Sequence, residues 1–378
     1  MNLKDTFSFF YQGQGYFRVY NKLATGYVYY KNKKRNLVTG QTEFTDINEI
    51  LKRLDSIHLN QDYKRTIYHF TYEWGLAQKS MPVGDEDPLV VFLHYLEDQE
   101  FKFESNSSSS KLRVLEKVPF DFYNKQFKKI YQHLLLGNCY QVNLTNKFRF
   151  HFDDINSLFK IFNHKHNIGA FAHGTNLPCL NQLIISNSPE CLFKIKNKNI
   201  YTYPIKGTTT QDKQSLKKLL KSKKNQAELF MITDLMTNDL ASLGVLPVEV
   251  LKKKVVLKVP HLYHTYSVIR ARLNPNLKLS TLMDKIFPGG SITGAPKKRV
   301  MEIIKELEPN PRGIYCGSTL LLDGKIKTAS INIRTASIDL KNKILEYGAG
   351  GGITLRSNAK VEYEEMNKKL NSFIDLLR

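Results

Sequence analysis

Residues 287–309 (FPGGSITGAPKKRVMEIIKELEP) constrain the fold more than any other stretch, because they join a glycine-rich loop to a helix. Gly289, Gly290 and Gly294 permit backbone conformations that a side chain would forbid. Pro296 suits the first turn of a helix, and apolar residues then recur at spacings of three and four. The sequence therefore predicts a tight loop that opens directly into a half-buried helix.

Two roles are open for this loop. A glycine-rich loop at the start of a helix directs free N–H groups and the positive end of the helix dipole at one point, which favours a bound anion. A tight turn ahead of a core helix would need the same residues. We hypothesise that the loop holds a carboxylate.

The composition indicates a globular protein with reduced thiols. At 378 residues and 42% hydrophobic side chains, the chain can bury a large core as one domain or as two. No apolar run reaches the roughly 18 residues of a membrane span, and the N-terminus lacks the pattern of a signal peptide. The four cysteines are scattered without a CxxC pair, which argues against a zinc site or a disulfide framework. We expect a cytoplasmic protein that does not bind membranes.

The net charge of +21 admits two interpretations. A surface this basic could bind nucleic acid. The lysines, however, are spread along the whole chain, and no helix-turn-helix, zinc-finger or RNA-recognition signature accompanies them. We therefore expect a solvated, lysine-rich surface that attracts anionic substrates, and no nucleic-acid partner.

One polar segment divides the chain. SNSSSS, at residues 105–110, is a low-complexity stretch that is too polar to join a core. We predict an N-terminal part at residues 1–104, a polar loop at 105–118, and a main body at 119–378.

Three segments of the main body place single polar residues in apolar surroundings. Glu190 lies in SPECLF, Lys206 lies in PIKGT, and Glu228 belongs to a predicted helix in AELFMITDLMTND. Lone acids and lysines are usually solvated, so each of these signals is weak when it stands alone.

The last predicted helix, at residues 360–377, carries a polar face. Glu362, Glu365 and Lys369 are spaced by three and four residues, which puts them on one side of the helix. An exposed ladder of ion pairs would explain this face. If Glu228 lay close, the paired carboxylates would instead need a cation, and such hard oxygen ligands suit Mg²⁺. Just before this helix, the glycine cluster at 348–352 would let a ligand approach the backbone closely.

Taken together, these residues resemble the chorismate-utilising enzymes, and among their branches the one that forms aminodeoxychorismate. The resemblance covers residues 119–375 and only loosely the earlier part, at TYEWGL and DEDPL. Ten motifs occur in the family's order: GNCYQVNLT, SPECLF, PIKGT, AELFMITDLMTNDL, HTYS, FPGGSITGAPKKRVMEIIKELEP, YCGS, INIRT, GAGGGI and EYEEMNKK.

The resemblance implies an α+β fold: one large chorismate-binding domain in which two β-sheets pack face to face and helices cover the outside. Residues 119–378 would form its catalytic core. It also implies Mg²⁺ as cofactor and chorismate as substrate. Ammonia would come from solution or from a separate glutamine amidotransferase subunit.

The resemblance also assigns roles to individual residues. Lys206 would be the nucleophile, and Glu190 the general acid and later the base. The remaining assignments are magnesium carboxylates at Glu228, Glu362 and Glu365, and substrate contacts at Thr208, His264, Ser291, Thr293, Tyr315, Arg334, Gly350, Gly352 and Lys369.

Two positions distinguish the branches of the family. Anthranilate synthases resemble this chain but typically have alanine at the position of Lys206, where a lysine amine of lowered pKa is a competent nucleophile. Isochorismate and salicylate synthases carry a lysine where this chain has Gln141. We therefore expect chorismate and ammonia to yield 4-amino-4-deoxychorismate through a lysine adduct. The alternatives are an anthranilate synthase component, a non-catalytic basic binding module, and an idle scaffold subunit.

Overall fold

The computed structural model describes residues 2–103, 111–163, 167–210, 212–244, 247–259 and 262–377. The first part of the predicted polar loop at 105–118, residues 105–110, lies outside these ranges. Its remaining part is not all loop, because β7 (Arg113–Glu116) pairs with the end of β8 (Gln141–His151).

Antiparallel pairing joins the strands into one continuous sheet with two arms, which meet at β2 (Tyr16–Tyr29). The first arm runs through β6 (Val90–Phe101), β5 (Tyr63–Phe70), β17 (Ser318–Gly324), β18 (Ile326–Ile331), β11 (Cys191–Lys196), β12 (Asn199–Thr202) and β15 (Leu262–Arg272), with β13 (Ile205–Thr210) and β14 (Val248–Val259) on β15. The second runs through β1 (Phe7–Gly13), β9 (His173–Leu177), β10 (Gln182–Ser186), β19 (Thr335–Asp339), β20 (Ile344–Ile353) and β8, whose outer edge carries β7 and β16 (Gly294–Ala295).

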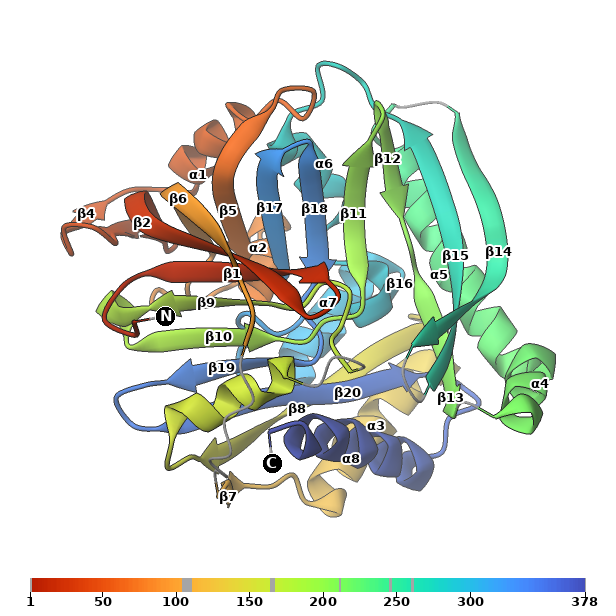
Figure 1. The fold of residues 1–378 in the computed structure, drawn as a ribbon. Helices are drawn as coiled ribbons and strands as arrows, with labels where there is room; N and C mark the ends of the chain where they lie inside the picture. Colours follow the sequence, from red (N-terminus) through yellow and green to blue (C-terminus); the bar gives the residue numbers. More distant parts are fainter. Residues whose placement is uncertain are drawn as a thin grey trace.

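The predicted α+β class is confirmed, and the two expected sheets are the two arms. In Figure 1 the strands of the first arm run mainly upward and those of the second run mainly across. β2 joins the arms because its 14 residues pair with β6 along most of their length, with β1 at one end and with β3 (Lys33–Asn36) at the other. The short β4 (Thr42–Phe44) extends β3.

Helices cover both arms. α8 (Ala359–Asp375) and α3 (Phe120–Leu135) pack on β20 and β8, and α5 (Lys223–Ala241) packs on β13, β14 and β15. The other helices and 3-10 turns are α1 (Ile47–Asp55), α2 (Tyr72–Gln78), α4 (Lys213–Lys221), α6 (Leu279–Ile286), α7 (Lys297–Leu307), η1 (Ile155–Phe162), η2 (Pro178–Leu180) and η3 (Gly290–Ile292). Among the described residues, no helix is long and apolar enough to span a membrane.

The loop and helix predicted at 287–309 are present as η3, β16 and α7, but the three glycines act differently. Only Gly294 has a positive φ, of 142°, and a Cβ there would lie 2.0 Å from the Gln141 carbonyl oxygen. Gly289 and Gly290 are not in the glycine-only region of backbone conformation. A side chain at these two sites would instead collide with neighbouring side chains, because the loop is packed tightly against the core.

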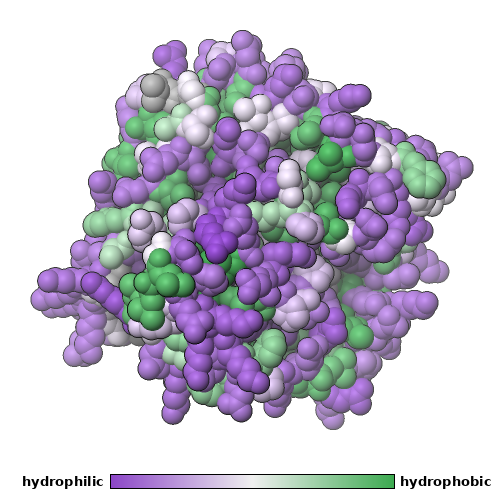
Figure 2. Space-filling view, turned by 180° about the vertical axis from the view of Figure 1, so that it is seen from behind, coloured by the Kyte–Doolittle hydropathy of each residue, from purple (hydrophilic) through white to green (hydrophobic). Residues whose placement is uncertain are grey.

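One large apolar core includes side chains from both arms and from the helices. Phe9 is fully buried and packs edge-to-face on Phe17, Phe103 and Phe162, with ring centroids 5.0–5.7 Å away. Such ring pairs contribute both apolar burial and favourable quadrupole contacts. The N-terminal part therefore shares its core with the rest of the chain. The surface in Figure 2 is mostly hydrophilic, with small apolar patches.

We expect Phe9→Ala to lower the free energy of unfolding by about 3–5 kcal/mol, since it leaves a cavity in the shared core. Urea denaturation, followed by circular dichroism, measures this change. Phe44→Ala is the matched control, because Phe44 is 96% exposed, and it should be nearly neutral. A similar loss in both variants would contradict the shared core.

Candidate active site

Two turns lie side by side and bring Glu190 and Arg334 together. Ile331 N–H donates to the Glu190 carbonyl oxygen (3.0 Å), and Asn187 N–H donates to the Arg334 carbonyl oxygen (2.9 Å). Arg334 has a φ of 52°, a left-handed conformation that is uncommon for residues with a side chain. The turn after β18 therefore lies against the turn that precedes β11.

A bulge in β13 directs Lys206. The register with β15 shifts between Lys206 and Thr208, and Gly207 between them has a φ of 73°. An extra residue of this kind bends a strand and re-aims its neighbours. Lys206 Nζ lies 3.4 Å from the Ser291 carbonyl oxygen, to which it donates. Thr208 pairs with His264 in the ladder, but the Thr208 side chain lies outside the described part of the structure.

Glu190 is buried, at 4% exposed, and its Oε1 has no hydrogen-bond partner. The buried Oγ of Ser291 lies beside this carboxyl group, and among the described residues neither Oγ nor Oε1 has a hydrogen bond of normal geometry. Burial raises the pKa of Glu190, while the neighbouring Ser291 and Lys206 oppose the shift. A carboxyl group held closer to its protonated form, beside unsatisfied polar atoms, can donate a proton to a ligand.

Lys206 is shifted in the complementary direction. Burial lowers its pKa, and the negative charges of Glu190, Glu228 and Glu365 oppose the shift. A lysine amine that loses its proton more easily is a better nucleophile. Glu228 is half-buried on α5, and the same helix places Leu235 against Gly290 two turns later. Glu228 therefore faces the side of α5 that borders the loop.

The glycine cluster forms an open edge of β20. Thr145 N–H and Asn143 N–H donate to groups beyond the outer edge of β8, so their partners Gly350 and Gly352 present N–H groups away from β8. β19 pairs with β20 only as far as Tyr347, and no other described strand pairs with this edge beyond that point. Backbone donors on such an edge can bind a carboxylate.

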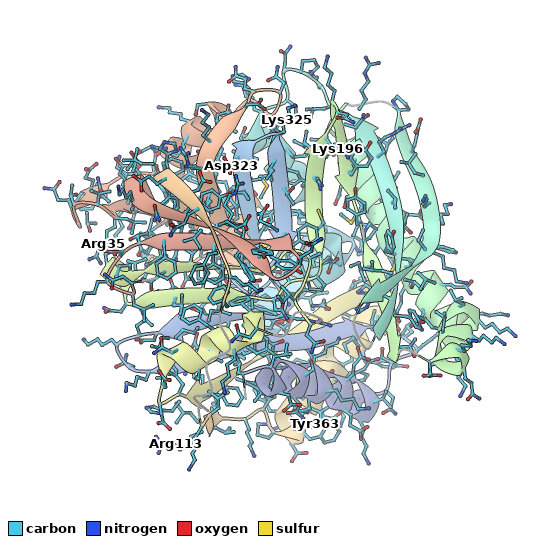
Figure 3. The ribbon with its side chains drawn as sticks, viewed as in Figure 1. Arg35, Arg113, Lys196, Asp323, Lys325 and Tyr363 are labelled. Carbon is cyan, nitrogen blue, oxygen red and sulfur yellow. The ribbon has the colours of Figure 1, made fainter. Side chains whose placement is uncertain are left out.

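α8 supplies three charged groups beside this edge. Lys369 Nζ donates to the Gly350 carbonyl oxygen (2.9 Å) and pairs with Glu365 (2.8 Å). A Cβ at Gly351 would lie 3.7 Å from Oε2 of the buried Glu362. One ion pair of the predicted Glu–Lys ladder, between Glu365 and Lys369, is therefore present. α8 is held in place where Tyr363, labelled in Figure 3, donates to the Val118 carbonyl oxygen (2.7 Å).

The three predicted magnesium carboxylates belong to this region of the molecule. The negative charges of Glu228 and Glu365 both raise the pKa of Lys206, so both acids lie near it. Glu362 is on the same helix as Glu365. Within the described ranges, no three His, Cys, Asp or Glu side chains form a group compact enough to hold a metal. The donor chemistry, three carboxylates, fits a hard cation such as Mg²⁺.

Arg334 and His264 form a positive, partly dry corner. Burial lowers the pKa of Arg334, and among the described residues no acidic side chain contributes to the shift. His264 is 4% exposed, and burial, followed by the charge of Arg334, lowers its pKa to about 4. A guanidinium without a carboxylate partner attracts an anionic ligand.

Two predicted substrate contacts lie differently from the others. The Thr293 hydroxyl is buried and donates to the Gly289 carbonyl oxygen (2.9 Å) within the loop. The ring of Tyr315 packs against Gly348, where a Cβ would lie 2.2 Å from it. The cavity that Tyr315 lines contains neither Glu190 nor Lys206.

Sequence reasoning missed the buried pair of Arg312 and Glu308 next to the loop. Their side chains are only 3% and 7% exposed and lie 2.7 Å apart. The spacing of four is typical of a helical ion pair, but Pro309 and Pro311 between them exclude a helix. No sequence signal therefore pointed to this contact.

Three comparisons bear on this arrangement. The model of the family described as chorismate binding enzyme matches residues 12–375. The aminodeoxychorismate synthase component 1 of Salmonella typhimurium is 39% identical over 80% of this chain and 68% of its own length. The Escherichia coli protein of the same name is 38% identical over 68% of this chain and 57% of its own.

Among solved structures, the anthranilate synthase component I of Streptococcus pneumoniae superposes with a TM-score of 0.78. The match covers 97% of this chain and 93% of that one at 21% identity. A likeness at this identity supports the fold alone.

We expect His264 to make the free energy of unfolding depend on pH in the mildly acidic range. The unfolded imidazole, with a pKa of about 6.5, takes up a proton before the folded one does, whose pKa is about 4. The free energy of unfolding therefore falls as the pH drops from about 6.5 to about 4, by up to about 3 kcal/mol. His264→Gln should flatten this part of the curve in urea titrations, whereas the control His133→Gln on α3 should not. Parallel curves for wild type and His264→Gln would contradict the shift.

Proposed function

Since the chain belongs to the family of chorismate binding enzymes, we propose that it acts as component 1 of an aminodeoxychorismate synthase. It would convert chorismate and ammonia to 4-amino-4-deoxychorismate and water. The observation that carries the proposal is the pair of Lys206, whose pKa burial lowers, and Glu190, whose pKa burial raises. This pair offers a nucleophile and an acid to one ligand.

Substrate binding rests on the two anionic groups of chorismate. Arg334 offers a planar guanidinium that can grip a carboxylate through two hydrogen bonds. The N–H groups of Gly350 and Gly352 and the ammonium of Lys369 offer a second set of donors at the edge of β20. His264 would border the ring in its neutral form.

The first chemical step joins Lys206 to the ring. Nζ of neutral Lys206 forms a bond to C2, the ring double bonds shift, and the C4–oxygen bond breaks. Glu190 donates its proton to the departing hydroxyl, which leaves as water. The product of this step is a secondary ammonium between the ring and Lys206, which keeps both protons of the attacking amine, beside an ionised Glu190.

The second step reverses the bond shift. Ammonia forms a bond to C4, the double bonds return, and the C2–nitrogen bond to Lys206 breaks. Glu190, now ionised, accepts the proton that the incoming ammonia gives up. The enzyme returns to its starting state, and the net change replaces a hydroxyl with an amine.

Glu228, Glu362 and Glu365 would hold Mg²⁺, which when bound neutralises and orients a carboxylate of the substrate. The donors are carboxylate oxygens, the ligands that Mg²⁺ prefers. Ammonia would be supplied from solution or by a separate glutamine amidotransferase, consistent with the "component 1" in the names of the relatives.

An anthranilate synthase component is the alternative that shares most of this site. In such an enzyme the amine of Lys206 would have no task, and its burial beside Glu190 would be incidental. A non-catalytic basic module is the more distant alternative. It would leave the unsatisfied atoms of Glu190 and Ser291 without a ligand, at a cost in stability.

The proposal is tested by the product. Purified chain, chorismate, Mg²⁺ and an ammonium salt at mildly alkaline pH should yield a product that keeps the enolpyruvyl group and gains an amine, as identified by mass spectrometry. Lys206→Ala should lower this turnover by about 10³-fold or more, because it removes the nucleophile. Lys327→Ala, at a buried lysine paired with Asp62, is the control. Anthranilate as the product would select the alternative, and full activity of Lys206→Ala would remove the adduct from the mechanism.

We expect Glu365→Gln to weaken Mg²⁺ binding about tenfold or more, because a neutral amide replaces a charged ligand. Calorimetric titration with Mg²⁺ in the absence of substrate measures this directly, and the Mg²⁺ dependence of turnover should shift in parallel. Glu364→Gln, at an exposed acid next to it on α8, should leave both unchanged. Equal Mg²⁺ affinity in the two variants would contradict the assignment of Glu365.

A further inference from the structure

We infer that Arg312 is a positioning residue, which holds the loop at 290–293 in the shape that presents the Ser291 carbonyl to Lys206. The effect on turnover rests on the proposed function. The effect on the loop does not, and each can be measured separately.

The side chain of Arg312 binds three segments at once. Nε and Nη2 donate to the two oxygens of Glu308 (2.7 Å each), at the end of α7. Nη1 donates to the Ile292 carbonyl oxygen (2.8 Å) in the loop. Nη2 also donates to the Asn143 carbonyl oxygen (2.8 Å) in β8. One buried guanidinium thus ties a helix end, a loop and a strand together.

Glu308 extends the same connection along β8. Its Oε1 accepts hydrogen bonds from the N–H (2.8 Å) and the hydroxyl (3.0 Å) of Thr145. Between these contacts, Asn143 N–H donates to the Thr293 carbonyl oxygen (2.8 Å). Residues 143 and 145 lie opposite Gly352 and Gly350 in the ladder. The loop and the substrate-facing edge of β20 are therefore held to the same two residues of β8.

Arg312 is itself held from the other side. Glu73 of α2 accepts the backbone N–H groups of Arg312 (2.8 Å) and Gly313 (2.9 Å). The guanidinium carbon lies 4.5 Å from the centre of the Tyr72 ring. These contacts leave Arg312 little freedom, so its donors stay aimed at the loop.

The carbonyl that Arg312 binds and the carbonyl that Lys206 binds belong to adjacent residues. Ile292, whose carbonyl Arg312 binds, directly follows Ser291, whose carbonyl accepts from Lys206 Nζ. Ser291 Oγ faces the same buried space as Glu190. A shift of the loop would therefore displace both groups that border the reacting pair.

Lysine cannot replace arginine here, because an ammonium lacks the planar fork that reaches Glu308, Ile292 and Asn143 together. We expect Arg312→Lys to lower kcat by about 10- to 100-fold, the usual effect of a misplacement near 1 Å. KM for chorismate should stay within about threefold, because Arg334 lies on another turn and β20 keeps its own ladder with β8. Arg149→Lys is the matched control, since Arg149 of β8 binds Glu346 of β20 (2.7 Å), and among the described residues its side chain pairs only with Glu346 and Glu116, away from the loop.

A second measurement is independent of the reaction. Reductive methylation with formaldehyde and cyanoborohydride, followed by peptide mass spectrometry, gives the modification rate of each lysine in the free enzyme. Lys206 should react several-fold faster in Arg312→Lys than in wild type, while the buried Lys327, on β18, should keep its rate. Should Arg312→Lys fail to fold, Glu308→Gln takes its place in both experiments, with the same expected changes.

Wild-type values of kcat and of Lys206 modification in the variant would overturn the inference. So would a lower kcat that merely follows a lower melting temperature while the Lys206 rate stays unchanged. A wild-type chain that does not aminate chorismate would defeat the proposed function, yet the methylation rates would still decide the role of Arg312. A lower kcat, a preserved KM and faster labelling of Lys206 together would establish it.

Discussion

The buried ion pair of Arg312 and Glu308 connects parts of the chain that are far apart in the sequence. Its hydrogen bonds reach β8, the loop before α7 and the end of α7, and the Arg312 backbone is bound by Glu73 of α2. Charges this deep are costly to bury unless their donors and acceptors are paired, and here the guanidinium of Arg312 makes four hydrogen bonds through all three of its nitrogens. The loop at 290–293 is therefore held in place by residues outside the site.

Burial also sets the chemistry on the other side of that loop. The same exclusion of water raises the pKa of Glu190 and lowers the pKa of Lys206, so each is shifted toward its neutral form. A neutral acid next to a neutral amine is the starting condition for protonating a leaving group while attacking a ring. Burying these two polar groups lowers the stability of the fold, and the large apolar core that both arms of the sheet share offsets this loss.

Much of the site could be predicted because its parts are local. The spacing of Glu362, Glu365 and Lys369 places them on one face of α8, and the Lys369–Glu365 pair is present. Residue spacing could not predict that the Thr293 hydroxyl would donate a hydrogen bond within the loop, or that the Tyr315 ring would pack on Gly348. These outcomes depend on which segments touch, and periodicity carries no such information. Gly289 and Gly290 are small for the same reason, since Ile331 and Leu235 fill the space beside them.

The sequence by itself determined the helices at 297–307 and 359–375, the loop between apolar elements, and the set of acids, lysines and glycines available for chemistry. These follow from side-chain periodicity and from residue type, which act over a few positions. Only the tertiary structure decided that β18, β11 and β13 would place Arg334, Glu190 and Lys206 in one region, and that Arg312 would support the loop beside them. Long-range pairing of strands sets such distances, and burial then sets the pKa values, because both depend on residues far apart along the chain.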